Sequence, residues 1–393
     1  MRGARAMVAT VVFAGAVVAF QIGKVAVAAM PLRDAFGLGT AALGALGAAI
    51  ALLGVIASVP AGAAVAALGA RRVLLAGLAS TLAGAAGAAL AGSFAALMTA
   101  RAIEGLGFLC VVVAGGAAID RSASGRARGI AYACWSCATP LGIAAAMVAG
   151  PHFATWHGLA SFAALLAAVA LALVAVVVPR DPRAHRRFDA RAAVRGGRDV
   201  FGEAGPRAAG LMFALYSLMF FALFGFLPFL LGHRLQLDAL AAGSMSGAAA
   251  AANAIGNLAA GALLARVRPA ALVATAGAVM ALCACGIFLP AFGAWTTFAL
   301  CVAFSAVGGL LPATLLASAP LVSSAPARVP LTLGLLLQGS NTGQALGPVV
   351  VGVLIQHAGW PAAGAVVVGA GVLLVVGAGA LDRALRAQRC ATA

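Results

Sequence analysis

Long apolar runs separated by short polar segments repeat along the whole chain. A membrane-spanning helix needs about 20 mostly apolar residues. Twelve segments meet this requirement, and we expect each to span a membrane: 7–30, 40–68, 73–91, 94–119, 129–150, 158–178, 208–231, 240–265, 270–289, 294–321, 330–356 and 361–381. The first begins like a signal peptide, but the pattern continues after it, so we expect an uncleaved first span.

Basic residues lie almost entirely on one side of the predicted membrane. If the N-terminus is cytoplasmic, 21 of the 25 Lys and Arg residues fall in cytoplasmic segments and only Arg33 and Arg234 fall outside. Cytoplasmic segments of membrane proteins carry such an excess of Lys and Arg. The pattern therefore predicts a multi-pass protein of a bacterial-type cytoplasmic (inner) membrane, with both termini cytoplasmic.

Composition excludes several other classes of protein. The chain is 64% hydrophobic and 9% charged, whereas soluble domains are about 45–50% apolar and about 25% charged. This excludes a soluble enzyme and a disordered chain. The net charge of +16 is explained by the cytoplasmic segments, so we expect the lipid bilayer, and no nucleic acid, to be a partner.

The two groups of six spans are related as a repeat. The polar stretch 179–206 separates them, which predicts an N-terminal half (1–178), a cytoplasmic linker (179–206) and a C-terminal half (207–393). A shift of 199 positions places Gly62 on Gly261, and a basic cluster follows each glycine. Parallel six-span repeats with binding between them are a design of transporters.

Motifs within this frame resemble those of the major facilitator superfamily. The segment after the second span resembles that family's gating signature at four positions, Gly62, Gly69, Arg71 and Arg72. In the second copy, Gly261 and Arg266 match. Alanines stand where the signature acids belong, at Ala66 and Ala265, so we expect a weaker or different latch between the halves.

The fourth span gives a second match over Arg101-Ala-Ile-Glu104-Gly105-Leu-Gly107, while the antiporter motif of the fifth span is only partly present. The resemblance covers nearly the whole chain. It implies an all-α membrane protein with twelve transmembrane helices in two pseudo-symmetric halves. It also implies a transporter, not an enzyme, that works by alternating access without a cofactor, and we expect a monomer.

Three ionisable side chains are predicted inside spans: Lys24, Arg101 and Glu104. Such groups are costly in a bilayer unless they are paired or hydrated. Lys24, with Gln21 one turn away, could bind an anionic substrate or extend to the outer headgroups. Arg101 and Glu104 share a helix face. Glu104 could form a structural ion pair with Arg101 or with Lys24, or it could carry protons while Arg101 binds substrate or tunes Glu104.

Two cations and one acid give the predicted cavity a net charge of +1. This favours a small organic anion or amphiphilic acid as substrate and protons as the coupling ion. A proton-driven multidrug or metabolite exporter remains the alternative. An intramembrane enzyme is disfavoured because no catalytic constellation and no metal-binding spacing is present, and a receptor or scaffold of the same fold is a third possibility.

Other polar residues in the spans follow helical spacing. They predict hydrogen bonds between helices or, alternatively, contacts with substrate. They are Tyr132, Tyr216, Asn253, Asn257, Gln338 and Asn341.

Overall fold

The computed structural model describes residues 2–122, 125–180, 190–289, 291–325 and 328–392. Within these ranges the chain forms helices and contains no strand. In the N-terminal half the helices are α1 (Arg2–Val27), α2 (Ala29–Phe36), α3 (Thr40–Ala48), η1 (Ala49–Ala51), α4 (Leu52–Leu68), α5 (Ala70–Ala89), α6 (Phe94–Ser122), α7 (Gly125–Ala149), η2 (Gly150–His152) and α8 (Trp156–Val177).

The remaining helices begin inside the predicted linker. They are α9 (Ala190–Gly202), α10 (Ala204–Phe224), α11 (Leu227–Phe229), η3 (Leu230–Arg234), α12 (Ala239–Leu264), α13 (Pro269–Phe288), α14 (Ala294–Gly308), α15 (Leu310–Val322) and α16 (Val329–Thr392). The helix α9 was not expected from the sequence, which predicts only a polar linker there. Its Val200 is buried, so this part of the linker is packed against the helix bundle.

Eleven helical segments among the described residues are long and apolar enough to cross a membrane. The last of them, Val329–Ala387, has 59 residues, about twice what one crossing requires. Gly359 divides it with φ 78° and ψ −178°, a backbone conformation that glycine adopts readily. The expected eleventh and twelfth spans are thus the two arms of α16 on either side of this turn.

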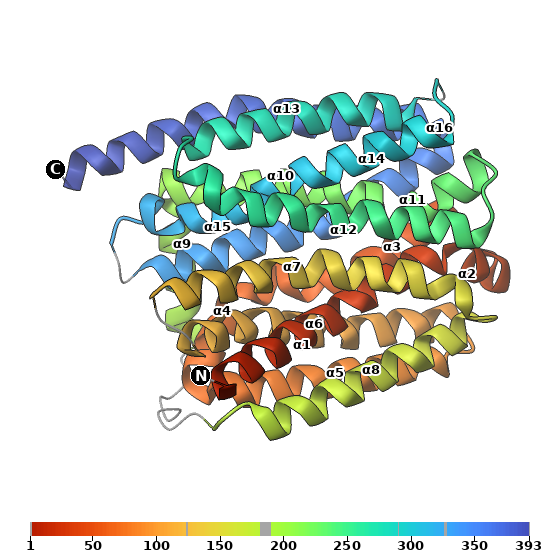
Figure 1. Cartoon of the computed structure of the whole chain (residues 1–393), viewed down its shortest axis with the longest axis horizontal. Coiled ribbons are helices and arrows are strands. Elements are labelled where there is room, and N and C mark those ends of the chain that lie inside the picture. Colours follow the sequence, from red (N-terminus) through yellow and green to blue (C-terminus); the bar gives the residue numbers. More distant parts are fainter. Residues whose placement is uncertain (1, 123–124, 181–189, 290, 326–327, 393) are drawn as a thin grey trace.

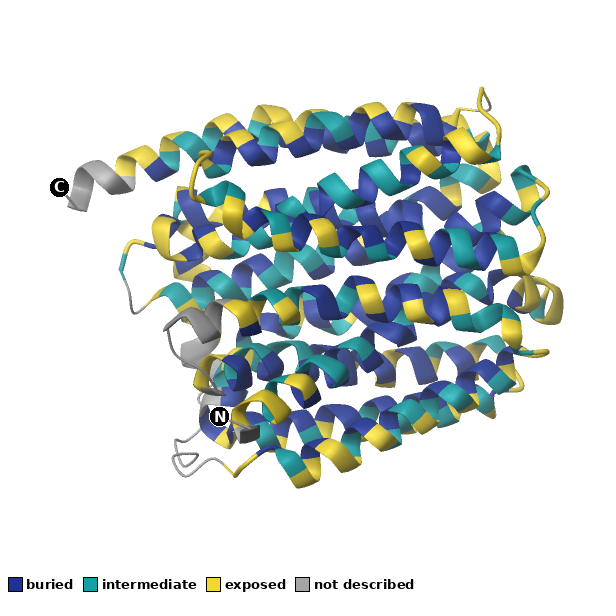
Figure 2. Cartoon of the chain, in the orientation of Figure 1, coloured by how far each residue is buried: buried dark blue, intermediate teal, exposed yellow. Residues whose placement is uncertain are grey.

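The helices are arranged side by side, with both termini near one end of the bundle and α2 and α11 at the other (Figure 1). In the N-terminal half, α1 contacts α6, α7 and α8; in the C-terminal half, α16 contacts α10 and α13. Buried and exposed positions alternate along each helix (Figure 2), so each one presents an apolar face to its neighbours.

Two sets of helix contacts form the seam between the halves. In one set α3 and α4 pack against α16, and in the other α7 packs against α12. At one end of the seam Thr40 donates a hydrogen bond to the Gly352 carbonyl at 2.8 Å. Nearby, Gly44 approaches the Pro348 carbonyl so closely that a Cβ would lie 2.2 Å from its oxygen. Small residues therefore allow the two halves to meet backbone to backbone.

Candidate functional site

The three charged residues predicted inside the membrane form one cluster in the N-terminal half. The Nζ of Lys24 lies 2.5 Å from Oε1 of Glu104, and Arg101 pairs with the other oxygen, Oε2. Lys24 also donates to Oε1 of Gln21 at 2.6 Å. Both ion pairs of the structural alternative are therefore present, and Gln21, Lys24, Arg101 and Glu104 form what we call the charged cluster.

Helix geometry brings these side chains together. Gln21 and Lys24 are three residues apart on α1, and Arg101 and Glu104 are three apart on α6, so each pair lies on one face. Glycines bring the neighbouring helices close to α6. A Cβ on Gly84 of α5 would lie 2.6 Å from Cγ of Glu104.

Arg101 joins three helices. Its Nη1 donates to the Gln21 carbonyl at 2.7 Å and its Nε to the Leu46 carbonyl at 3.3 Å. Its Nη2 has no hydrogen-bond partner among the described residues. The cluster therefore retains one guanidinium nitrogen, Nη2 of Arg101, that has no acceptor among the described residues.

The charged cluster is closed off from solvent in this conformation. Arg101 and Glu104 are 0% exposed and Lys24 is 5% exposed. An ionised group at such a position is tolerated only when it is paired. With Glu104 ionised the cluster carries one net positive charge, the value expected from the sequence.

A second polar cluster lies in the C-terminal half and contains no charge. Asn253 on α12 donates to the hydroxyl of Tyr216 at 3.2 Å and to the Ser305 carbonyl at 3.0 Å. Asn257 donates to Oδ1 of Asn253 at 2.9 Å. These residues, Tyr216, Asn253, Asn257 and Ser305, are the amide cluster, and they link α10, α12 and α14.

Gln338 and Asn341 belong to neither cluster but bridge the halves. Gln338 donates to the Val55 carbonyl at 2.6 Å, and Asn341 donates to the Ser58 hydroxyl at 3.2 Å. Tyr132 lies elsewhere, with its hydroxyl 3.3 Å from Oδ1 of Asp120. The predicted binding residues are thus distributed over four places.

The residues of the gating signature lie at helix ends. Gly69 separates α4 from α5 with φ 86°, and Arg71 donates to the Ala175 carbonyl of α8 at 2.7 Å. The Arg71 contact stays within the N-terminal half. Of the other signature residues, Arg72 and Arg266 are exposed, and a Cβ on Gly62 or Gly261 would meet open space.

Several contributors to these clusters carry no signal in the sequence. Leu46 and Ser305 act through backbone carbonyls, which any residue could supply. Gly84 matters only because α5 lies beside Glu104. Their roles follow from the tertiary packing of the helices and not from residue type.

Comparison with known proteins identifies relatives over nearly the whole chain. The sequence profile described as Major Facilitator Superfamily matches residues 11–325. No curated protein matches the chain in sequence. The solved structure of the human organic anion transporter MFSD10 (TETRAN) is similar with a TM-score of 0.74 at 22% identity, covering 95% of this chain and 99% of that one.

A bacterial homologue of the human lysosomal transporter Spinster is also similar. Its inward-facing, unoccupied structure has a TM-score of 0.73 at 16% identity and covers 98% of this chain and 97% of that one. Its inward-facing, occupied structure has a TM-score of 0.72 at 16% identity and covers 96% of each chain. At these identities the likeness shows the shared fold alone.

Proposed function

Since the chain belongs to the Major Facilitator Superfamily, we propose that it is a proton-coupled secondary transporter of a small organic anion or amphiphilic acid. It would act in a bacterial-type cytoplasmic membrane, with both termini cytoplasmic, as a monomer without a cofactor. The observation that carries this proposal is the charged cluster, whose two buried cations share one carboxylate.

The net positive charge of the charged cluster favours an anionic substrate. A net positive charge in a medium of low dielectric constant attracts a carboxylate and repels a cationic drug. Arg101 also has a free donor at Nη2, and guanidinium groups bind carboxylates well. A substrate carboxylate could therefore be held by Arg101 and Lys24 once these are released from Glu104.

Glu104 is the candidate proton carrier. Both of its oxygens accept from cations in this structure. Protonation of Glu104 would weaken both ion pairs and raise the net charge of the cluster from +1 to +2, which favours arrival of an anion. Proton and anion would then bind together, so the cluster supports movement of both in the same direction.

The two halves supply the moving parts. Residues 1–178 and 207–393 would rock against each other about the seam, with 179–206 as the connection between them, as in other transporters built from repeats. Support comes from the seam itself, where Gln338 and Asn341 bond to α4. Hydrogen bonds of this kind in membranes are worth about 0.6–2 kcal/mol each and can be broken and remade during transport.

Flux in proteoliposomes tests the proposal. Radiolabelled benzoate and octanoate would be offered with and without an inwardly directed proton gradient. We expect gradient-driven uptake that falls about tenfold or more in Lys24→Met, the loss of about 1.4 kcal/mol of binding. Arg33→Met, which removes an exposed cation outside the cluster, is the matched control and should transport normally. Equal uptake by Lys24→Met and the wild type would contradict the role of the cluster.

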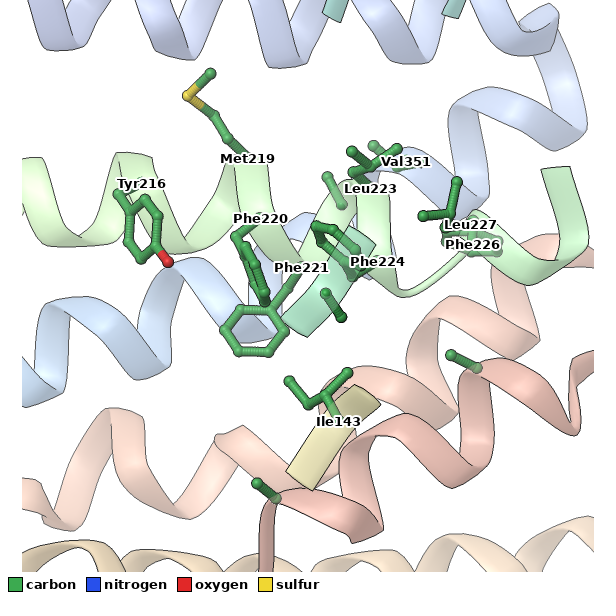
Figure 3. Close-up of a cluster of buried hydrophobic side chains, with 14 of the residues drawn as sticks. Ile143, Tyr216, Met219, Phe220, Phe221, Leu223, Phe224, Phe226, Leu227 and Val351 are labelled. Carbon is green, nitrogen blue, oxygen red and sulfur yellow. The ribbon is translucent and has the colours of Figure 1, made fainter. Parts of the chain in front are cut away.

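A second candidate function is supported by the aromatic side chains of α10. Phe220 and Phe224 are stacked with ring centroids 4.5 Å apart, and Phe221 points toward Ile143 of the other half (Figure 3). Such a surface suits the apolar body of a drug or metabolite. Efflux of tetraphenylphosphonium against a proton gradient, unchanged in Lys24→Met, would favour a proton-driven multidrug or metabolite exporter.

A further inference from the structure

A chamber of about 420 Å³ is lined by residues of both halves. Its lining includes residues of α2 and α11, which lie at the end of the bundle opposite the chain termini (Figure 1). It is lined from the N-terminal half by the end of α1 and the loop before α8, and from the C-terminal half by α11, η3 and the start of α12. Ligand pockets have volumes of about 300–1,000 Å³ and mostly apolar walls with a few polar groups. This outer chamber has the size and the composition of such a pocket.

Flat aromatic rings form the walls of the outer chamber. Phe229 and His233 are stacked with an interplanar angle of 5° and ring centroids 5.3 Å apart. From the N-terminal half, Phe153 and Trp156 also line the chamber, and the ring centroid of Trp156 lies 5.7 Å from that of Phe36. Rings held in this way favour a planar apolar group between them.

The rim of the outer chamber contains a strained residue. Gln236 has φ 56°, the single positive value among the described residues other than glycine. Its side chain donates to the His233 carbonyl at 2.7 Å, which holds the ring-bearing turn in place. Such backbone outliers cost free energy and are found at functional sites.

The outer chamber shares small lining side chains with a second, narrower cavity. Ala26 and Ala29 line both the outer chamber and this narrow cavity of about 30 Å³. Gln344 of α16 lines that narrow cavity, is 3% exposed, and has an amide nitrogen without a hydrogen-bond partner among the described residues. An unsatisfied buried donor favours a ligand that brings an acceptor.

The outer chamber is separate from the charged cluster. Ile22 and Ala26 are four residues apart and share one face of α1, and they line the narrow cavity together with Ala29 at the start of α2. Gln21 and Lys24 lie on another face, against α6, because residues that share a helix face are three or four apart. A ligand in the outer chamber therefore does not touch Lys24.

From these observations we infer that the outer chamber is a second binding site, for a small amphiphile with a planar aromatic ring. The ring lies between Trp156 and Phe229, and the acceptor of the ligand points inward to the amide of Gln344. The inference extends the proposed function by naming an aromatic substrate class. It rests on the proposed function only in taking the ligand to be a solute that the protein carries.

Calorimetric titration of the purified full-length protein with 2-acetylnaphthalene, an uncharged probe with a planar ring and a carbonyl acceptor, tests this site. Ala29→Phe should weaken binding at least about tenfold because the added ring fills space that Ala29 leaves open in the lining. Phe229→Leu should weaken it about fivefold through the lost ring contact. Gln344→Leu should weaken it about five- to tenfold through the lost hydrogen bond. Ala102→Phe, on an exposed position of α6, is the matched control and should bind like the wild type.

Lys24→Met separates this inference from the proposed function. The dissociation constant should stay within about twofold of the wild type, since Lys24 does not line the chamber. Loss of binding in Lys24→Met alone would place the ligand at the charged cluster and overturn the second site while supporting the proposed function. An absence of binding by the wild type, or identical binding by all variants, would also overturn the inference. Binding with the expected pattern but without flux would leave the site standing and remove the transport proposal.

Discussion

Buried polar side chains have different partners in the two halves. In the N-terminal half, α1 and α6 are joined by the charged cluster, in which Glu104 pairs with Lys24 and Arg101. In the C-terminal half, α10 and α12 are joined by the neutral amide cluster through Tyr216 and Asn253. The described contacts at the centres of the two halves thus differ in whether they include charged side chains.

The two clusters differ in how they respond to protons. A neutral hydrogen-bonded group in the bilayer contributes modestly and does not respond to protons near neutral pH. An ion cluster is costly to break and changes charge when its acid is protonated. Under the proposed function, the N-terminal half would therefore carry the coupling, and the aromatic and amide side chains of the C-terminal half would provide packing and apolar contact.

Removal of Glu104 should have the largest effect on stability. In Glu104→Met, Lys24 and Arg101 lose their shared counter-ion and repel each other while buried. Breaking a buried ion pair by removing one partner costs about 3–5 kcal/mol. Thermal unfolding in detergent should show a large fall in Tm.

Two variants control this measurement. Lys24→Met keeps the pair between Arg101 and Glu104 and should lose much less stability. Asp34→Asn removes an acid from an exposed position and should unfold like the wild type. If Glu104→Met were as stable as Lys24→Met, the cluster would not depend on its shared acid.

The corresponding change in the C-terminal half should cost less. Asn253→Leu removes the hydrogen bonds to Tyr216 and Ser305 but leaves no charge unpaired. Loss of such membrane hydrogen bonds should cost about 1–2 kcal/mol. The same thermal unfolding series measures it. A cost equal to that of Glu104→Met would remove the distinction between the two clusters.

The helix α9 allows the halves to be compared at the end of the seam near the termini. A Cβ on Gly197 would lie 3.0 Å from Cγ1 of Val59 in the N-terminal half, and one on Gly196 would lie 2.9 Å from Cδ1 of Leu331 in the C-terminal half. Val is stiff at χ1, whereas the end of a Leu side chain can move. Alanine also gains about 1 kcal/mol over glycine in a helix.

These effects predict different stabilities for the two glycine-to-alanine substitutions. Gly196→Ala should be neutral or stabilising, since Leu331 can adjust. Gly197→Ala should be about 1 kcal/mol less stable than Gly196→Ala, because Val59 cannot yield as easily. Chemical denaturation of the two variants measures the difference. Equal stabilities would mean that α9 is not held against both halves.

Much of this architecture follows from the sequence. The apolar runs predicted the spans, and the i, i+3 spacing predicted that Gln21 and Lys24, and likewise Arg101 and Glu104, share helix faces. The spacing of Asn253 and Asn257 likewise predicted neighbours on one turn, and their side chains are bonded at 2.9 Å. These are local relations, fixed by helix geometry alone.

The relations that the sequence did not predict are tertiary. Whether Glu104 meets Lys24, 80 positions away, depends on which faces of α1 and α6 meet. The contact of the Tyr132 hydroxyl with Asp120 on α6 was not predicted either, because it depends on how α6 and α7 pack, and a binding role for Tyr132 stays a prediction. The helix α9 was not predicted because arginines are interspersed among its apolar residues.

The smallest predicted effect concerns Glu203, which lies in the predicted linker at the junction of α9 and α10. Its carboxylate pairs with Arg328 and accepts from the Ser324 hydroxyl at 2.9 Å. Partial burial raises the pKa of Glu203, but the bonds from Arg328 and Ser324 outweigh it and hold the pKa below its ordinary value of 4.5. The ionised form is therefore favoured by folding, and its contribution is present above pH 4.5 and lost as the pH falls through the lowered value.

A pH series of unfolding measures this contribution, which for an ion pair near the surface should be about 0.2–1 kcal/mol. Glu203→Gln should be less stable than the wild type at pH 7. The difference in the free energy of unfolding should disappear as the pH falls through the lowered pKa of Glu203. Glu203 and Glu104 would then differ in the stability that is lost when each is removed. Glu203 lies at the edge of the bundle, where its removal costs little. Glu104 joins two buried cations, which would be left without their counter-ion at a large cost in stability. A Glu203→Gln variant that lost as much stability as Glu104→Met would show that burial does not set the cost of removing an acid from this protein.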